Sequence, residues 1–136
     1  MPSTPIPNVP TAAFASDIKV VLDGRWTFRP RLPKTEQEMA KGYMGVEAQD
    51  IASNECMLFE YRAPAPRVFT MRNCKSPLWI AFVAPDGRVA QSVFAMPETP
   101  YVRHTAPCAR VVEFGPDTQA VPRVGQTLTV VPSQGH

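Results

Sequence analysis

Histidine and cysteine are the residues of this 136-residue chain whose chemistry could support nucleophilic catalysis. The histidines are His104 and the C-terminal His136. A catalytic pair would require His104 to lie beside Cys74 or Cys108 and to lower the pKa of that thiol. Cys108 follows His104 by four positions in a proline-rich stretch. This spacing favours a loop histidine near a buried cysteine, so an enzyme of unknown reaction is only the third functional hypothesis.

Carboxylates could also act as a general acid and a general base. The pair would come from Glu60, Asp86 and Glu113. Asp86 is explained by the Pro-Asp-Gly turn in which it lies, and Glu60 by the alternation of a strand. Glu113 lies between Val112 and Phe114 and is predicted to be a buried polar anchor. We therefore expect no catalytic residue in this chain and predict that it is not an enzyme.

Cysteine spacing argues against a metal site. Cys56, Cys74 and Cys108 are 18 and 34 residues apart, and no CxxC or Cys/His ligand pattern occurs. An odd number of cysteines disfavours a disulfide framework, although one bridge stays open, and the three are predicted to be small buried hydrophobic residues. No GxxxxGK[ST] or GxGxxG motif occurs, so no phosphate-cradling loop is expected. We expect neither metal nor cofactor.

Basic and aromatic residues alternate over residues 25–31, as they do in platforms that bind single-stranded nucleic acid. Strand alternation instead places Trp26 and Phe28 on the face opposite Thr27, which predicts an aromatic face in the core or at a protein interface. The net charge is only +2, from 14 basic and 12 acidic residues. No apolar run approaches the roughly 18 residues that span a bilayer. We expect neither nucleic acid nor membrane as a partner.

Proline determines which elements can position these side chains. Sixteen prolines make up about 12% of the chain, against a usual 5% or so. Proline interrupts helices and sheet interiors, which excludes a helical bundle. A hairpin around Asp23-Gly24 and a capping box at Thr35–Glu38, with a helix stopping near Gly42, are predicted. Further strands are expected at residues 57–61, 68–72, 78–83, 88–95, 109–114 and 127–131, and the run at 78–83 is apolar enough to be covered on both faces.

These elements predict a mainly β fold, a small antiparallel barrel or sandwich of about seven short strands with one short helix. Residues 1–17 are predicted to be an extended proline-rich arm, 18–132 a single domain and 133–136 a tail. The first 16 residues hold four prolines and no charged side chain. They do not resemble a secretory signal, which favours a location in the cytoplasm or in a virion. The predicted partner-binding residues are Pro5, Ile6, Pro7, Val9, Pro10, Phe14, Trp26 and Phe28.

Several short motifs between Thr35 and Val130 occur in the order found in one bacterial and phage family. They are Gly42-Tyr43-Met44, Met57-Leu58-Phe59, Phe69-Thr70-Met71-Arg72-Asn73, Pro77-Leu78, Ile80, Phe82, Asp86-Gly87, Val111-Val112-Glu113 and Gly125. In these motifs the chain resembles domain-of-unknown-function family 192. The resemblance covers roughly 95 residues and implies a small, mostly β, barrel-like domain with no established activity.

The chain departs from the family pattern at four positions. Trp79 stands where the family usually has Asp, Thr70 where it has Trp, Cys74 where it has Thr, and Gln126 where it has Asp. Two acids are thereby absent from the stretch that would line a polar site. The resemblance therefore implies that the fold is kept and that the site is remodelled.

Three hypotheses follow for the function. The first is a non-enzymatic structural or interaction protein, such as a phage virion component of the capsid-decoration or cement type, whose arm contacts neighbouring subunits. The alternative is a small-molecule-binding domain with a polar pocket around Arg72, Asn73, Lys75 and Glu113. The third is the enzyme discussed above. The first hypothesis implies other protein subunits as partners, in a homo- or hetero-oligomer.

Overall fold

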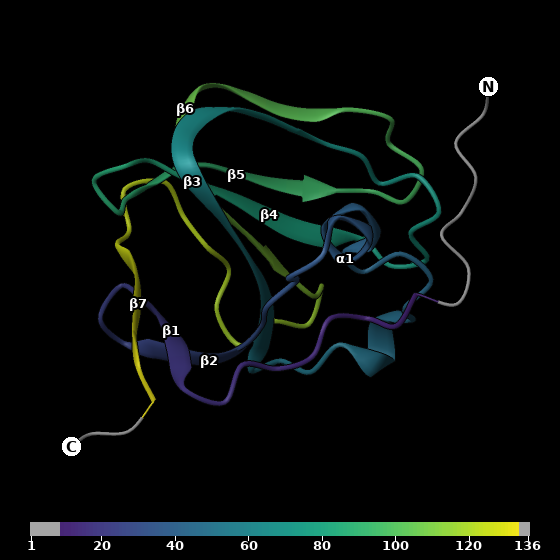
Figure 1. Cartoon of the computed structure of the whole chain (residues 1–136), viewed down its shortest axis with the longest axis horizontal. Coiled ribbons are helices and arrows are strands. Elements are labelled where there is room, and N and C mark those ends of the chain that lie inside the picture. Colours follow the sequence, from purple (N-terminus) through teal and green to yellow (C-terminus); the bar gives the residue numbers. More distant parts are fainter. Residues whose placement is uncertain (1–8, 134–136) are drawn as a thin grey trace.

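Seven β-strands and one short α-helix form the regular structure of residues 9–133, the part of the chain that the computed structural model describes. The strands form one sheet in the order β5-β4-β6-β3-β2-β1-β7 (Figure 1). The predicted mainly β fold is confirmed. The elements are β1 (Ile18–Leu22), β2 (Trp26–Arg31), α1 (Glu36–Lys41), the 3-10 helix η1 (Ala48–Asp50), β3 (Glu55–Phe69), β4 (Leu78–Val83), β5 (Val89–Ala95), β6 (Val102–Phe114) and β7 (Leu128–Pro132).

Two features of the sheet differ from the predicted antiparallel barrel or sandwich. β2 and β3 pair in parallel, because the chain between them crosses over through α1 and η1. The edge strands β5 and β7 meet only at one corner, where the amide of Val89 donates to Gln126 O and the amide of Leu128 donates to Gly87 O, each at 2.8 Å. The sheet is therefore strongly curved without being closed into a barrel.

One core draws side chains from all seven strands. Phe28 is fully buried there, and its ring packs edge-on against Phe114 with the centroids 4.9 Å apart. The prediction that Phe28 contacts a partner is therefore wrong, because strand alternation turns this ring inward. Trp26 is partly buried against the same core. The buried members are Val20, Leu22, Phe28, Cys56, Leu58, Ala81, Val83, Val89, Val112, Phe114 and Leu128.

A second core lies on the opposite face of the central strands. Met57 and Phe59 of β3, Ile80 of β4 and Val111 of β6 alternate with the members of the first core. The central strands are thus covered on both faces, as predicted for residues 78–83, where burial is nearly complete. This second core is the one that contains the candidate site.

A bend in β3 and β6 covers the second core. In Figure 1 these two strands run together across the top of the view and bend downward at its left. Their pairing slips between Glu60 and Ala65 and again between Ala65 and Arg67. The far part of β3 thereby returns over the near part, so that the rings of Phe69 and Phe59 lie 5.0 Å apart.

The long strands β3 and β6 differ from the prediction. The structure has one continuous strand, β3, where separate strands were expected at residues 57–61 and 68–72, and β6 includes the stretch before residue 109 that was expected to be a loop. Pro64 and Pro66 of β3 lie beyond the pairing with β2, and Pro107 of β6 lies beyond the pairing with β4. A proline is tolerated where one side of a strand has no partner.

Local sequence signals determine the ends of α1 and the first hairpin. The amide of Glu38 donates to Thr35 Oγ1 at 3.0 Å, and the Glu38 carboxylate accepts from the Thr35 amide, which confirms the predicted capping box. The helix ends at Gly42, where φ is 51°. Asp23 and Gly24 both have positive φ, as the predicted tight hairpin turn requires.

Residues 9–17 pack on the domain instead of extending from it. Phe14 lies between the guanidinium groups of Arg29 and Arg31, at 4.0 and 3.9 Å from its ring centroid. The amide of Leu32 donates to Ala13 O at 3.0 Å. Cation–π contacts and main-chain bonds therefore hold this stretch of the predicted extended arm on its own domain. Val9 is half-buried, Pro10 is exposed, and Pro5, Ile6 and Pro7 lie outside the described residues.

Candidate functional site

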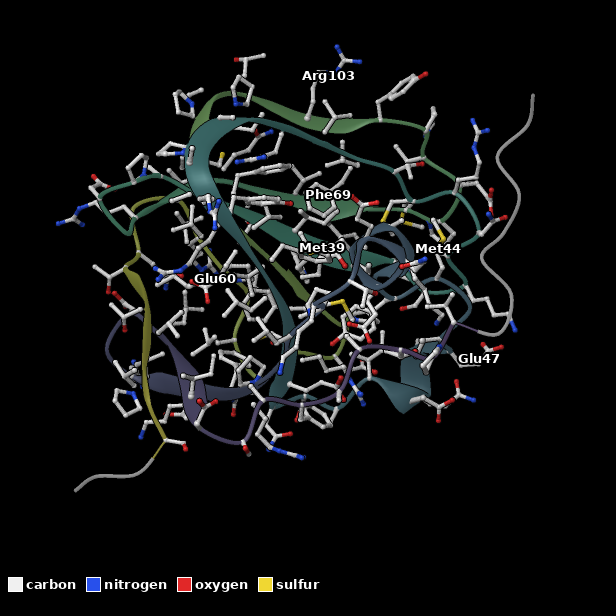
Figure 2. All side chains as sticks on the ribbon, in the orientation of Figure 1. Met39, Met44, Glu47, Glu60, Phe69 and Arg103 are labelled. Carbon is white, nitrogen blue, oxygen red and sulfur yellow. The ribbon has the colours of Figure 1, made fainter. Side chains whose placement is uncertain are left out.

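A cavity of about 480 Å³ lies between α1 and the bent part of β3. Figure 2 shows Met39 of α1 and Phe69 of β3 near the centre of the view, whereas Arg103 lies at its top. We refer to this cavity as the pocket. Its lining residues are Met39, Ala40, Lys41, Gly42, Tyr43, Met44, Phe59, Tyr61, Val68, Phe69, Thr70, Arg72, Asn73, Cys74 and Glu113.

Glu113 is the buried acid of the pocket. It lies on the same face of β6 as Val111, and its side chain is buried in the second core. A Cβ added at Gly42 would come within 3.3 Å of Glu113 Oε1, so the end of α1 packs directly on the carboxyl group. Oε1 has no hydrogen-bond partner among the described residues. Burial raises the pKa of Glu113 to about 8.

Apolar and aromatic side chains form most of the remaining wall. Phe59 and Phe69 meet edge to face, and Tyr61 continues the same face of β3 two residues beyond Phe59. Met39 and Met44 contribute thioethers from α1 and from the turn after it. Such a wall can enclose the apolar body of a small molecule while Glu113 offers one polar contact.

Burial also shifts the pKa values of Lys41 and Cys74, which line the pocket. Lys41 Nζ donates to Thr11 Oγ1 and to Met44 O, each at 3.0 Å, and burial lowers the pKa of this lysine. Burial, with the nearby Glu113, raises the pKa of the Cys74 thiol to about 12. A thiol with so high a pKa is protonated at neutral pH and is a poor nucleophile.

Three of the four predicted pocket residues line the pocket. They are Arg72, Asn73 and Glu113. Lys75 does not, because its exposed ammonium group faces Glu47 Oε1 at 3.4 Å. The expected contact of Glu113 with Arg72 or Asn73 is not formed, since Arg72 is exposed and no hydrogen bond joins them in the described chain.

Glu55 is a second buried acid, and both of its carboxylate oxygens accept hydrogen bonds. Its Oε2 accepts from Arg31 Nε at 2.7 Å and from the Tyr43 hydroxyl at 2.9 Å. Its Oε1 accepts from the Ala52 amide at 2.9 Å. Glu55 therefore has a structural explanation that Glu113 lacks.

No catalytic pair forms around the histidine. Nδ1 of His104 lies 2.6 Å from Gln91 Oε1, and the imidazole stacks on Phe82 with the centroids 5.5 Å apart. The nearby Cys108 donates to Ala106 O at 3.5 Å instead. All three cysteines are free and buried, as predicted for small hydrophobic residues. Within residues 9–133, no cluster of side chains could hold a metal ion.

Sequence reasoning missed most of the pocket wall. Phe59 and Tyr61 could have been found, because they alternate with Leu58 and share a face with Met57, the residue paired with Glu113. Met39 and Met44 gave no such signal, since a six-residue helix has too little periodicity to show which side packs. Gly42 was predicted only to end the helix, yet it is also where the main chain packs on Glu113.

A family model matches residues 19–127, which is most of the chain. The matched family is domain-of-unknown-function family 192, described as an uncharacterized ACR. The chain belongs to this family. No curated protein matches the chain. Of the four positions noted as departures from the family pattern, Thr70 and Cys74 line the pocket.

Two solved structures share the fold. A protein of unknown function from Novosphingobium aromaticivorans DSM 12444 superposes with a TM-score of 0.71 at 27% identity, over 90% of this chain and 94% of that one. A protein from Sinorhizobium meliloti 1021, described as a candidate transcription regulator, gives the same TM-score at 19% identity, over 90% and 98% of the chains. At that identity the second likeness concerns the fold alone. Within residues 9–133, the helices are too short to span a bilayer.

Proposed function

We propose that this chain is a small-molecule-binding domain, and that its ligand has a largely apolar body and one polar group that reaches Glu113. The volume of the pocket falls within the roughly 300–1,000 Å³ of small-molecule sites. Its wall combines aromatic rings and thioethers with few polar groups, which is the usual composition of such sites.

The observation that carries the proposal is the unpaired Oε1 of Glu113. A buried polar atom without a partner destabilises a fold by about 1–3 kcal/mol. Four side-chain atoms of the described residues are of this kind, and only Glu113 Oε1 belongs to a residue that lines the pocket. An apolar residue at position 113 would fill this core without that loss. A ligand that hydrogen-bonds the Glu113 carboxyl group from the pocket gives this group a purpose that packing does not.

A substitution that fills the pocket tests the proposal. Val68 lines the pocket on β3 and is 60% exposed, so Val68→Trp can place an indole over the cavity without disturbing either core. Val124 is 67% exposed and lies away from the pocket, so Val124→Trp is a matched control. Hexan-1-ol and indole are the probes, and the increase in melting temperature that they cause is measured.

Both probes are expected to raise the melting temperature of the unmodified protein and of Val124→Trp, because a ligand that binds only the folded state stabilises it. Neither is expected to do so for Val68→Trp. Equal stabilisation of the two variants, or no stabilisation of the unmodified protein, would contradict the proposal.

A protein-contact role is the second candidate function. Phe94 of edge strand β5, Met96 directly after this strand and Tyr101 before β6 lie close together and are 42–65% exposed. Exposed apolar side chains gathered on one face are typical of interaction sites. This feature favours the structural or interaction hypothesis, with assembly in a virion or in the cytoplasm as its form.

Sedimentation at increasing protein concentration tests that role. Self-association is expected for the unmodified protein and for Val124→Ser, and is expected to weaken in Phe94→Ser. A protein that stays monomeric at every concentration would refute assembly through this face.

A further inference from the structure

Resting on the proposed function, we propose that the ligand is an organic cation, a protonated amine on an apolar body, whose ammonium group pairs with the carboxylate of Glu113. Three features of the pocket support this choice of chemistry. They are the missing counter-ion of Glu113, the aromatic rings around it and the proton that the carboxyl group holds.

Glu113 has no cationic partner within the described residues. The titratable groups that face it are Tyr43 after α1, Tyr61 of β3 and Cys74 after β3, and none of them carries a positive charge. Lys41 points its ammonium group to Thr11 and to the main chain of Met44 instead. A buried carboxylate is stable only beside a cation or strong donors. An incoming ammonium group supplies both.

Aromatic rings and thioethers lie around the acid. Phe59 is within 3.6 Å of the point where a Cβ at Gly42 would lie, which is also 3.3 Å from Glu113 Oε1. Phe69 packs on Phe59, and Tyr61 lines the same wall. The negative faces of such rings attract organic cations, and a desolvated carboxylate strengthens the attraction. An anionic ligand would gain no ion pair with Glu113 in either protonation state, and the ionised form would repel it. Of the two cationic side chains that line the pocket, Lys41 donates to Thr11 and to Met44 O, and Arg72 is exposed.

Amine binding would be coupled to the loss of one proton. Burial keeps the Glu113 carboxyl group protonated at neutral pH in the empty pocket, because its pKa is about 8. The ammonium group pairs with the ionised form, so the carboxyl proton passes to the buffer as the pair forms. The affinity should therefore rise about tenfold between pH 6 and pH 7 and less than about twofold between pH 8 and pH 9.

Three six-carbon probes distinguish the classes of ligand: hexylamine, hexan-1-ol and hexanoate. Hexylamine stays protonated over this pH range, as does a lysine side chain, whose ordinary pKa is about 10.4. In calorimetric titrations from pH 6 to pH 9, the affinity for hexylamine is expected to rise with pH as described above. The affinities for the other two probes are not expected to show this rise. At pH 6.5, comparison of buffers with different ionisation enthalpies should show about one proton released per amine bound.

Glu113→Gln keeps the shape of the side chain and removes the charge. This variant is expected to lose the preference for hexylamine over hexan-1-ol and the pH dependence, while still binding hexan-1-ol. Glu113→Asp is expected to keep part of the amine preference. Circular dichroism verifies that both variants fold, and the pH profile of the unmodified protein tests the inference independently of them.

The outcomes separate this inference from the proposed function. Binding of hexan-1-ol or hexanoate at least as tight as that of hexylamine at pH 8 would overturn the amine inference and leave a binding pocket in place. An affinity for hexylamine that falls as the pH rises would overturn it as well. Binding of none of the three probes would overturn both.

Discussion

Glu113 couples the stability of the fold to pH. Its carboxyl group is buried and unpaired, and its pKa rises from 4.5 to about 8 on folding. Between these values the folded protein retains a proton that the unfolded chain has already released. The stability that this retained proton gives the folded state is fully present below pH 4.5. It is lost as the pH rises through about 8, because the folded state must then bury a charge.

We expect the free energy of unfolding to fall between pH 4.5 and pH 8, by at most about 1.4 kcal/mol per pH unit. In Glu113→Gln this decline should disappear, because the amide does not titrate. Urea unfolding at several pH values measures both profiles. Glu60→Gln is the matched control, since Glu60 faces Arg110 at the surface of the same sheet. A decline that persists unchanged in Glu113→Gln would assign it to another group.

The residues on either side of Glu113 in the sequence were enough to predict its burial, but the side chains that it contacts could not be predicted. Val112 and Phe114 mark a buried strand, and alternation places Glu113 on the other covered face. The expected contact with Asn73 is not formed, because this residue lies in a turn with φ at 66°, where its main-chain amide donates to Glu98 Oε2 at 3.1 Å. Such turn geometry depends on contacts made between distant segments, which no local pattern encodes.

Helix α1 forms one wall of the pocket and depends on its cap. Six residues are too few for a helix to be stable by itself, so the reciprocal bonds of Thr35 and Glu38 hold its first turn. Packing of Gly42 on Glu113 then fixes its end. The position of Met39 in the pocket follows from these two anchors.

Thr35→Ala should lower the free energy of unfolding by about 0.5–2 kcal/mol and weaken the binding of hexan-1-ol. Thr35→Ser retains the hydroxyl group and should behave as the unmodified protein does. Chemical unfolding and calorimetric titration give the two readouts. Unchanged binding in a destabilised Thr35→Ala would show that α1 is not needed to close the pocket.

The N-terminal segment is an element of the domain from at least Ala12 onward. Ala12 is buried, and its carbonyl oxygen accepts from Arg31 Nη1 at 3.0 Å. Composition alone predicted an extended arm that contacts neighbouring subunits, because a proline-rich uncharged stretch lacks strand or helix periodicity. The contacts of Phe14 with Arg29 and Arg31 involve two side chains of β2 and could not be read locally.

Deletion of residues 1–16 should therefore lower the melting temperature, whereas the loss of an arm that contacts only other subunits would leave it unchanged. Phe14→Ala tests the aromatic contact by itself and should destabilise the fold by about 1–2 kcal/mol, with two cation–π contacts of about 0.5–1 kcal/mol each. Phe14→Tyr keeps the ring face and is the control. Equal melting of the deleted and full chains would show that the segment adds nothing to stability.

The whole molecule has two cores that share the central strands. The predictable part was the succession of short strands, since apolar runs and turn residues mark them. The bend of β3 and β6 was not predictable, because Pro64 and Pro66 suggested a break where the strand in fact continues on one paired side. That bend creates the second core, and with it the pocket.

Methionine methyl resonances test the presence of a ligand site in the pocket most directly. Met39 and Met44 line the pocket, whereas Met96 is 55% exposed and lies outside it, so the chain contains its own control. During titration with hexan-1-ol, the methyl signals of Met39 and Met44 should shift and saturate together while that of Met96 stays in place. Shifts confined to Met96, or no saturable shift of Met39 and Met44, would contradict the pocket as a binding site.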